Sequence, residues 1–431
     1  MPTLNKEQTK AFEVMASGKN VFLTGNAGTG KSFLVKTFIE YSQQNSKNIM
    51  VTAPTGIAAL NINGSTIHRA FKVPLDPIGP LTRISKITDA LKNADIIIID
   101  EISMVRFDVF SYIVRAIEKA CKVTKKAKQL IVVGDFFQLS PVLTDYQRKI
   151  LKQLWQKDIQ EGFAFEAPDW AKMNFQNIVL SQVVRQNEPA FVENLNNIRR
   201  GSIAALTSLQ QLSAAAPIKD AIYICSTNSE AADFNNDSLA KLATEERYFI
   251  SDIIGKVSAN DKVVDDEICL KIGARVMTLV NNVEGYYKNG SMGYVEGFVD
   301  DGVVVQIDDG IKILVQPYTW EIVEYDVKAG RLIKSVIGTY TQIPLKLAYA
   351  ITIHKSQGQT FNKINLNPYC FCEGQLYVAL SRASTSKGLY IKQRYINSKW
   401  LMTSSKVIDF MILLKKIKEA KFYESNQCCK F

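Results

Sequence analysis

The feature of this sequence that most restricts its fold is a glycine-rich segment near the start that ends in a lysine and a serine. It reads Gly25-Asn26-Ala27-Gly28-Thr29-Gly30-Lys31-Ser32, with an apolar strand-like run before it at residues 21–24 and a helical pattern after it. In such a loop the backbone N–H groups surround phosphate oxygens, the lysine reaches the β- and γ-phosphates, and the serine hydroxyl can ligate Mg²⁺. The order of strand, loop and helix therefore predicts a P-loop that binds a nucleoside triphosphate.

Two further apolar runs end in polar residues that suit the same chemistry. The run Ile96–Ile99 is followed by Asp100 and Glu101, and the run 130–133 is followed by a segment that contains Gln138. We expect Asp100 to hold Mg²⁺, usually through water, and Glu101 to polarise the attacking water. Gln138 is expected to contact the γ-phosphate or its water. Because parallel strands present their carboxyl ends at one edge of a sheet, these strand ends predict a single NTPase site.

Apolar runs alternate with helix-length segments along most of the chain. A first set lies at residues 21–23, 49–51, 96–99 and 130–133, and a second at residues 178–180, 221–224, 347–351 and 389–391. This alternation predicts two α/β layers with parallel sheets. Residues 289–345 are instead rich in turns and short strand-like runs, a pattern that predicts a small antiparallel barrel inserted into the second layer.

Composition excludes several classes of protein. At 431 residues and 47% hydrophobic content, the chain can bury more than one core. It has neither a run of about 18 apolar residues nor a secretory signal pattern at its start. The seven cysteines form no CxxC pair, so we expect reduced thiols in a cytosolic protein and no zinc site.

The positive charge is unevenly distributed. Of the formal net charge of +10, residues 383–431 contribute ten Lys or Arg against three acids, and a second basic run spans residues 119–128. Such a distribution favours a polyanionic partner, although solvated lysine-rich faces are also common. Charge alone leaves both interpretations open.

Nine short segments follow one another in a recognisable order. They read NKEQ, GNAGTGKS, APTGIAA, GSTIHRAF, IIIIDEISM, GDFFQLSPV, VVRQ, HKSQGQT and YVALSRA. Together they resemble superfamily-one DNA helicases of the RecD-like branch, most closely the Pif (petite integration frequency) family. The resemblance spans nearly the whole chain.

The resemblance implies a domain organisation. Residues 1–180 would form a first RecA-like domain with a small hairpin-like insertion (1B) at about residues 64–80. Residues 181–288 and 346–431 would form a second RecA-like domain with basic C-terminal helices. Residues 289–345 would be an SH3-like β-barrel insertion (2B).

The resemblance also implies roles around ATP and Mg²⁺. Gln8 would read the adenine base, since an amide can donate and accept at once. Arg185 and Arg382 would be arginine fingers supplied by the second domain, which stabilise charge on the transferred phosphoryl group. Gly358 would lie against the nucleotide.

A third implication concerns DNA. The turn His354-Lys355-Ser356-Gln357-Gly358 would contact the DNA backbone from the second domain. The first domain would contribute Pro54, Thr55, Gly56, Ser65, Thr66 and His68. Hydroxyls, lysine and backbone N–H groups suit phosphate contacts that do not select a base. Phe71, Phe136 and Phe137 are candidates to stack on bases, although phenylalanines at such positions also fill cores.

The expected function is an ATP-dependent DNA helicase that moves 5′→3′ on single-stranded DNA and unwinds forked duplexes. By family it would also act on G-quadruplexes and RNA–DNA hybrids, in repair, replication and telomere maintenance. We expect a monomer with no membrane segment, cytoplasmic and nucleoid-associated if bacterial. Two alternatives remain open: a DNA-dependent ATPase that does not translocate, which strand displacement would distinguish, and a small-molecule phosphotransferase, which would need no DNA.

Overall fold

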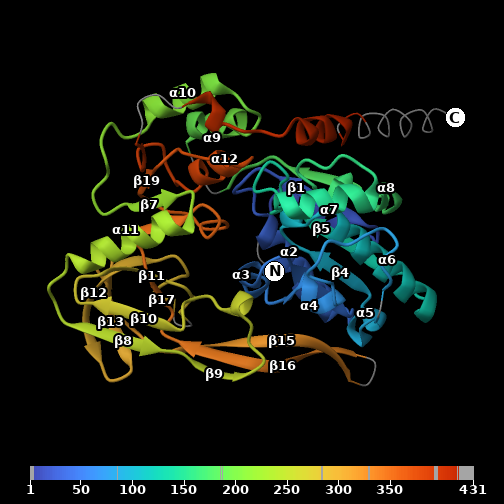
Figure 1. Ribbon diagram of the computed structural model, residues 1–431, viewed down its shortest axis with the longest axis horizontal. Coiled ribbons are helices and arrows are strands. Elements are labelled where there is room, and N and C mark those ends of the chain that lie inside the picture. Colours follow the sequence, from blue (N-terminus) through green and yellow to red (C-terminus); the bar gives the residue numbers. More distant parts are fainter. Residues whose placement is uncertain are drawn as a thin grey trace.

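The structure, a computed structural model, describes residues 4–84, 86–184, 186, 188–282, 285–328, 331–392, 397–414 and 416. Two α/β domains lie side by side, and a β-rich region extends below the second domain (Figure 1). Within these residues, no helix is long and apolar enough to cross a membrane.

The first domain is built on a parallel sheet of strand order β3-β2-β4-β5-β1-β6. Its strands are β1 (Val21–Gly25), β2 (Ile49–Ala53), β3 (Ser65–Thr66), β4 (Ile96–Ile99), β5 (Gln129–Val133) and β6 (Gln176–Leu180). Its helices are α1 (Lys6–Ala16), α2 (Lys31–Gln44), α3 (Gly56–Asn61), α4 (Ile67–Phe71), α5 (Asp89–Asn93), α6 (Phe107–Thr124), α7 (Asp145–Trp155) and α8 (Pro168–Lys172), with 3-10 turns η1 (Ile102–Met104) and η2 (Ala164–Glu166).

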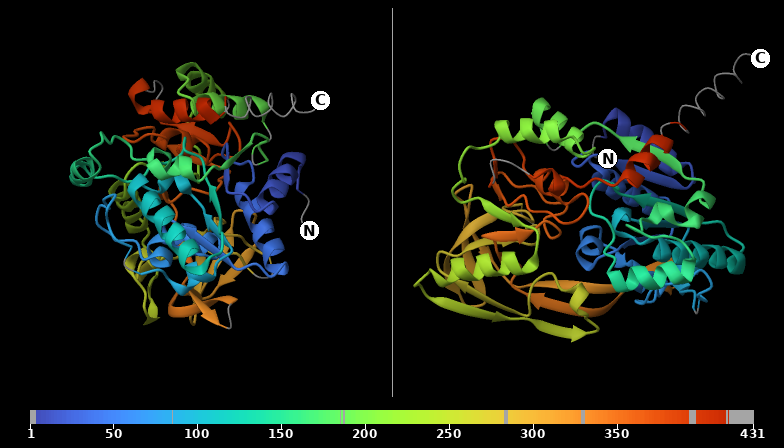
Figure 2. Two further views of the ribbon diagram at one scale, coloured as in Figure 1. Left: turned by 90° about the vertical axis from the view of Figure 1, so that its right-hand side faces the viewer. Right: turned by 45° about the horizontal axis from the view of Figure 1, so that its top comes forward.

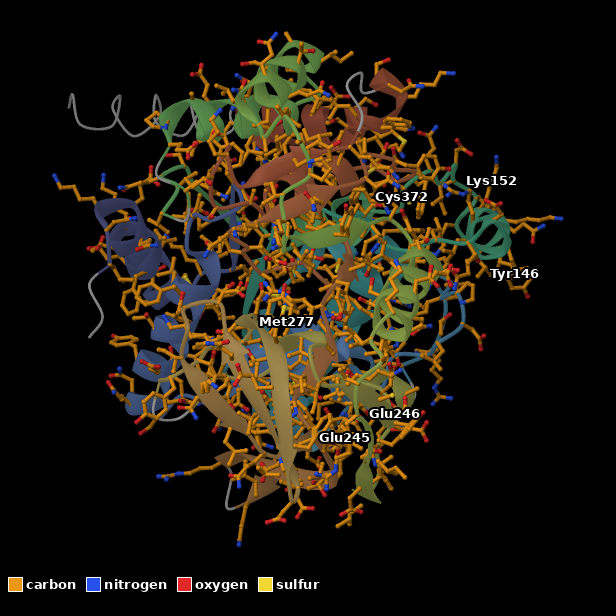
Figure 3. All side chains as sticks on the ribbon, turned by 90° about the vertical axis from the view of Figure 1, so that its left-hand side faces the viewer. Tyr146, Lys152, Glu245, Glu246, Met277 and Cys372 are labelled. Atoms are coloured by element: carbon orange, nitrogen blue, oxygen red, sulfur yellow. The ribbon has the colours of Figure 1, made fainter. Side chains whose placement is uncertain are left out.

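The isoleucine run of β4 shows why this sheet forms. Ile97 and Ile99 belong to the core cluster that includes α6, and Ile96 and Ile98 belong to the cluster that includes α2. Helices therefore cover both faces of the sheet, and a strand buried on both faces needs continuous apolar residues rather than alternation. The outer surface of α7 is different, because Tyr146 and Lys152 project from it into solvent (Figure 3).

The second domain has a smaller parallel sheet of order β18-β7-β19-β20. Its elements are α9 (Pro189–Ile198), α10 (Ile203–Leu212), β7 (Ile222–Cys225), α11 (Asn228–Ala240), β18 (Ala350–Thr352), β19 (Ile364–Leu366), α12 (Gln375–Leu380), β20 (Leu389–Ile391) and η4 (Ser398–Trp400). The apolar run at 347–351, predicted as one strand, is divided between two sheets. Its start lies in β17 (Leu345–Leu347), which pairs antiparallel with β11 (Arg275–Thr278), and its end lies in β18.

The β-region spans residues 246–347 and begins well before the predicted boundary at residue 289. Its antiparallel sheet has the order β14-β13-β12-β11-β17, a second sheet has the order β15-β16-β9, and β8 pairs with β10. The remaining bounds are β8 (Glu246–Ile250), β9 (Asp252–Gly255), η3 (Ala259–Asp261), β10 (Glu267–Lys271), β12 (Met292–Val299), β13 (Gly302–Ile307), β14 (Lys312–Val315), β15 (Tyr318–Lys328) and β16 (Arg331–Gln342). Among the strands before 289, β8 alternates exposed and half-buried residues and β9 is exposed throughout, so neither has a buried apolar run. The four residues of β11 are all buried, but the strand starts with Arg275 and was missed as well.

No hairpin forms among the described residues at 64–80, contrary to the predicted insertion. Residue Ser65 instead pairs with Thr52, so β3 extends the main sheet in parallel with β2. The Thr66 hydroxyl then accepts a hydrogen bond from the Arg69 N–H and begins α4. The described residues from 72 to 80, after α4, form turns and loop rather than paired strands.

The C-terminal helix, residues 405–414, packs on the first domain, whereas the sequence analysis assigned these residues to the second domain. Val407 and Leu414 lie in the core of the first domain. The Phe410 ring stacks on Phe165 with centroids 4.2 Å apart. Figures 1 and 2 show this helix returning from the second domain to the first. The basic residues after position 416 lie outside the described residues.

The long hairpin of β15 and β16 reaches from the β-region to the first domain (Figure 1). The Tyr325 hydroxyl accepts a hydrogen bond from the Val51 N–H at 2.9 Å and donates to the Val51 carbonyl at 3.2 Å. Lys72 pairs with Glu324 at 2.9 Å. Tyr325 thus satisfies the backbone of β2 just beyond the short strand β3.

Candidate active site and nucleic-acid groove

The P-loop adopts a conformation that only glycine allows at two positions. Gly25 has φ +155°, and a Cβ there would lie 2.4 Å from the Leu180 carbonyl oxygen. Gly30 has φ +78° and is the N-cap of α2, so the first N–H groups of that helix face the loop. The Lys31 ammonium donates to the carbonyls of Gly25 and Asn26 at 2.8 and 3.0 Å, and burial lowers its pKa. The loop therefore holds its lysine beside the donors that surround a phosphate.

Gln8 lies directly against this loop. Its side-chain Nε2 donates to the Thr29 carbonyl at 3.3 Å, and its Oε1 accepts from the Asn5 N–H at 3.1 Å. A Cβ on Gly30 would lie 2.5 Å from the same Nε2. The structure thus brings Gln8 to the P-loop, and its role as adenine reader stays a prediction.

The two carboxylates after β4 are adjacent in sequence; Asp100 is buried and Glu101 is half-buried. The Asp100 carboxylate accepts from the Glu101 N–H at 2.9 Å, and Glu101 has a left-handed φ of +51°. Burial raises the pKa of Asp100, and burial together with the charge of Asp100 raises the pKa of Glu101 to about 7. Ser32, Asp100 and Glu101 line one cavity. A hydroxyl and carboxylates that repel each other fit a bound Mg²⁺, which would relieve that repulsion.

The second domain contacts this site through Gln357. Its side-chain Nε2 donates to Glu101 Oε2 at 3.0 Å. Gln357 was predicted to contact DNA, and the structure places it on the proposed catalytic carboxylate instead. The same short turn therefore reaches both the ATP site and the space beyond it.

Arg382 lies at the same interface but is turned into the second domain. Its Nε donates to the Val378 carbonyl at 2.8 Å and its Nη1 to the Gln359 carbonyl at 3.2 Å. Its positive charge still acts on Glu101, where it lowers the pKa of the carboxyl and so opposes the effects of burial and of Asp100. A role as arginine finger would need this side chain to reorient. The other predicted finger, Arg185, lies outside the described residues.

Gln138 follows β5 at the domain interface. Its side chain is buried, and a Cβ on Gly374 of the second domain would lie 2.3 Å from its carbonyl oxygen. The second domain thus packs directly on the main chain of the segment that was predicted to sense the γ-phosphate.

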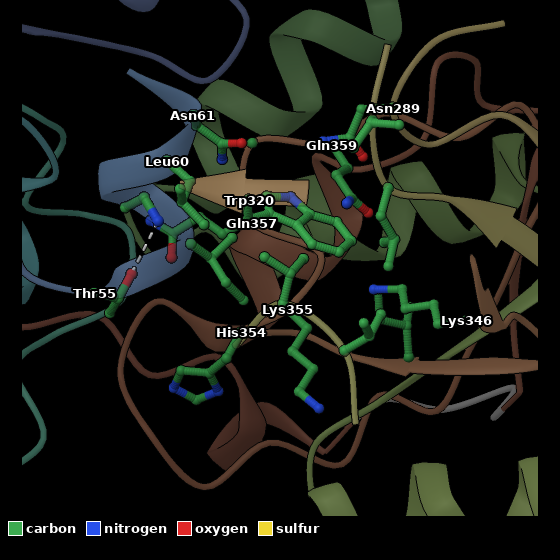
Figure 4. A pocket seen from close by; sticks show the side chains of 18 of the residues that line it. Thr55, Leu60, Asn61, Asn289, Trp320, Lys346, His354, Lys355, Gln357 and Gln359 are labelled. Atoms are coloured by element: carbon green, nitrogen blue, oxygen red, sulfur yellow. Dashed lines mark hydrogen bonds between the residues drawn. The ribbon is translucent and has the colours of Figure 1, made fainter. Parts of the chain in front are cut away.

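A groove of about 1730 Å³ continues from the ATP site between the two domains and the β-region. Thr55, Leu60 and Asn61 line it from the first domain, and His354, Lys355 and Gln359 line it from the second (Figure 4). The β-region contributes Asn289, Trp320 and Lys346. Thr55, His354, Lys355, Gln357 and Gly358 therefore line one cavity, and their contact with DNA stays a prediction.

Several other predicted DNA ligands do not line this groove. Phe71 and Phe136 are 1% exposed and fill the core, the alternative that the sequence left open. Ser356 is fully buried, and its hydroxyl donates to the Ile353 carbonyl at 2.8 Å. The other predicted DNA ligands outside the groove are Pro54, Gly56, Ser65, Thr66 and His68. Gly56 and Ser65 are buried, and the Thr66 hydroxyl caps α4. His68 Nδ1 lies 3.2 Å from the Val73 carbonyl oxygen. Ser356, Thr66 and His68 thus make contacts within the chain in this structure, and their contact with DNA stays a prediction.

Lys346 is the groove residue that the sequence did not reveal. Burial and, secondly, the charge of Lys355 lower its pKa to about 7. In the part of the chain that the structure describes, no acidic side chain forms an ion pair with it. The signal available in the sequence was the position of Lys346, two residues before Ala348, where the chain returns from the β-region to the second domain. Asp135, Arg199 and Tyr377 were also not singled out, although two of them lie inside quoted motifs.

The fold and the site define a P-loop NTPase with two RecA-like domains. The model of the family described as PIF1-like helicase matches residues 3–208. The ATP-dependent DNA helicase Pif1 of Campylobacter jejuni is 32% identical over 88% of this chain and 90% of its own length. The chain therefore belongs to the PIF1-like helicase family and is an enzyme that uses ATP with Mg²⁺.

Solved structures of Pif1 from Bacteroides support this family assignment, and they differ in their TM-scores against this chain. Bacteroides sp Pif1 in complex with ADP-AlF4 is 35% identical, with 96% of this chain and 98% of that chain covered, at a TM-score of 0.86. Bacteroides Pif1 bound to ssDNA is 36% identical, with 97% and 98% covered, at a TM-score of 0.69. Identity and coverage are alike, so the lower score reflects a different arrangement of the same parts.

Proposed function

We propose that this ATP-dependent DNA helicase moves 5′→3′ along single-stranded DNA held in the groove and unwinds forked duplex ahead of it. The observation that carries the proposal is the hydrogen bond between Gln357 and Glu101. It joins the turn that lines the groove to the carboxylate that acts on ATP. A movement of the groove turn can therefore shift the Glu101 carboxylate directly through the Gln357 side chain.

Chemistry at the ATP site is mostly positioning and charge stabilisation, as in phosphoryl transfer generally. Lys31 binds the phosphates, Ser32 and Asp100 would hold Mg²⁺, and Glu101 orients the attacking water. When bound, the metal neutralises charge on the phosphates. Because the second domain covers this site, hydrolysis depends on closure of the two domains.

The groove suits a single strand bound through its backbone. Lys346 and Lys355 supply positive charge, and Asn61, Asn289 and Gln359 supply amides. Such groups bind phosphates and sugars without selecting a base sequence. Trp320 is only 6% exposed and stacks on Tyr340 with ring centroids 5.6 Å apart, so its ring forms part of the groove wall.

The finer features of the proposal rest on family resemblance. These are the 5′→3′ polarity, action on G-quadruplexes and RNA–DNA hybrids, and roles in replication, repair and telomere maintenance. We also propose a cytoplasmic monomer that associates with the nucleoid if the cell is bacterial.

One experiment tests the proposal in two stages. ATP hydrolysis is measured with and without single-stranded DNA, and then unwinding is measured on duplexes with a 5′ tail or a 3′ tail. We expect DNA to stimulate hydrolysis and only the 5′-tailed duplex to be unwound. Stimulation without strand displacement would show a non-translocating ATPase. Full hydrolysis without DNA would exclude a helicase, and preference for the 3′ tail would reverse the polarity alone.

A further inference from the structure

The second domain holds two successive residues of the P-loop. The Ala27 N–H donates to the Tyr377 hydroxyl of α12 at 3.0 Å. The Asn26 side chain donates to Asn196 of α9 at 2.6 Å. Ala27 and Tyr377 are both buried. The hydroxyl of Tyr377 thus fixes one of the backbone amides of the phosphate-binding loop from the opposite domain.

The same helix α9 ends in a buried ion pair with the first domain. Arg199 Nη2 lies 2.6 Å from Asp135 Oδ1, and Arg199 Nε donates to Asp135 Oδ2 at 3.1 Å. The guanidinium also lies over the Phe137 ring, 4.1 Å from its centroid. A two-bond pair of this kind fixes direction as well as charge.

This ion pair is next to the catalytic lysine. The carboxylate of Asp135 has the largest electrostatic effect on Lys31 among its charged neighbours, ahead of Glu101, and Arg199 acts in the opposite sense. The phenol of Tyr377 is surrounded by the same charges, and burial first, then Asp135, raises its pKa to about 12. The hydroxyl is therefore protonated at every physiological pH.

We propose that Arg199 and Tyr377 are positioning residues through which the second domain prepares the P-loop for ATP. Arg199 holds the Asp135 carboxylate so that Lys31 is free to meet the phosphates, and Tyr377 fixes the Ala27 amide. Asp135 also accepts from the Phe137 N–H at 3.2 Å. Without Arg199 its uncompensated charge would draw the Lys31 ammonium, on which it acts more strongly than the other charged groups do, and a lysine held by a carboxylate is lost to phosphate binding. The inference concerns ATP binding and does not depend on polarity or on the DNA substrate.

The first test is a charge rescue. Affinity for ADP with Mg²⁺ is measured by calorimetry without DNA for wild type, Arg199→Gln, and Arg199→Gln with Asp135→Asn. We expect the single change to weaken binding roughly tenfold or more, as for a lost charge-assisted contact. The second change should restore most of the affinity, because it removes the carboxylate that captures Lys31. A double variant that binds as weakly as the single one, or a single one that binds normally, overturns the role of Arg199.

Removing a buried cation can unfold a protein, so Arg199→Lys is measured in parallel. Lysine keeps the charge and loses one of the two bonds, and we expect affinity between those of wild type and Arg199→Gln. If Arg199→Lys is folded and binds ADP as weakly as Arg199→Gln, the charge argument is wrong.

The second test removes only the tyrosine hydroxyl. Tyr377→Phe is compared with Tyr340→Phe, a buried tyrosine of β16 whose hydroxyl bonds the Val264 and Asp265 carbonyls. We expect similar losses in melting temperature, but a roughly 3- to 10-fold fall in kcat/KM for ATP only in Tyr377→Phe, the scale of one hydrogen bond. Equal kinetics in the two variants would reduce Tyr377 to a structural role.

Discussion

At the scale of single residues, the ATP site depends on groups whose charge is set by burial. Glu101 combines a left-handed backbone, a raised pKa and a hydrogen bond from Gln357. Its neighbour Asp100 is buried. Motif spacing was sufficient to find both carboxylates, but the contact with Gln357 joins residues 256 positions apart and could not be read from sequence.

Glu101→Gln should separate ATP binding from hydrolysis. Glutamine keeps the shape and can still accept the hydrogen bond from Gln357, but it cannot polarise water as a carboxylate does. We expect kcat to fall roughly 10²- to 10⁴-fold with nucleotide affinity within a few-fold of wild type. The matched variant Lys31→Ala should lose nucleotide affinity itself. Hydrolysis by Glu101→Gln at a rate near wild type would assign the water step to another group.

Lys346 should make DNA binding depend on pH. Its lowered pKa of about 7 means that the ammonium is largely neutral above that pH in the free protein. DNA phosphates favour the charged form, so affinity for single-stranded DNA should weaken as pH rises from about 6.5 to 8.5. Lys346→Arg stays charged and should flatten this dependence. A variant with the same pH profile as wild type would remove Lys346 from the DNA contacts.

At the scale of elements, predictability follows the continuity of the apolar sequence within a strand. Strands covered on both faces, such as β4 and β5, have continuous apolar sequences and were predicted. The exposed strand β9 and the three-residue strand β19 have no such pattern and were missed. The C-terminal helix does show apolar residues at helical spacing, but nothing in a local pattern says which domain they cover. For the same reason Phe71 and Phe136 could not be told from DNA contacts.

The packing of that helix predicts a stability change. Phe410 contacts Phe165, Phe22 and Phe136, whereas Ile412 on the same helix is 47% exposed. Phe410→Ala should lower the free energy of unfolding by roughly 2–4 kcal/mol, below the full cost for a completely buried ring. Ile412→Ala should change it by less than about 0.5 kcal/mol. Urea unfolding followed by tryptophan fluorescence would measure both, and similar losses would contradict the placement.

A carboxyl pair between the domains predicts how stability varies with pH. Burial first, and then the charge of Glu161 of the first domain, raises the pKa of Glu373 in the second domain to about 7. Lys406 faces the same cluster, 3.4 Å from Glu161 and 2.8 Å from Glu166. A carboxyl whose pKa is raised on folding binds its proton more tightly when folded, so its contribution to stability is lost as pH rises from about 4.5 to 7.

Glu373→Gln should remove this loss, because glutamine resembles the protonated acid at every pH. The difference in melting temperature between variant and wild type should therefore become more positive between pH 5 and pH 7.5. Subtracting wild type cancels other groups, including Glu101, that titrate in the same range. A difference that stays constant would show that Glu373 is ionised throughout.

At the scale of the whole molecule, three contacts show how the β-region is held against the first domain. These are Tyr325 with Val51, Lys72 with Glu324, and the pair of Arg69 with Asp261 at 2.8 Å. All three join the β-region to the first domain. The overall arrangement matches unliganded Pif1 from Bacteroides sp at a TM-score of 0.84 and Bacteroides Pif1 bound to ssDNA at 0.69. The three contacts thus belong to the arrangement that resembles the DNA-free relative.

Tyr325→Phe should therefore favour the arrangement that binds DNA. The change removes both hydrogen bonds to Val51 and leaves the ring in place, and a ligand that prefers one state gains affinity when the other state is destabilised. Loss of about 1 kcal/mol of hydrogen bonding would tighten binding of single-stranded DNA up to roughly fivefold. Tyr248→Phe, an exposed tyrosine of β8, serves as the control. Fluorescence anisotropy with a labelled oligonucleotide measures both, and weaker binding by Tyr325→Phe would mean that the hairpin is docked on the first domain in the DNA-bound state as well.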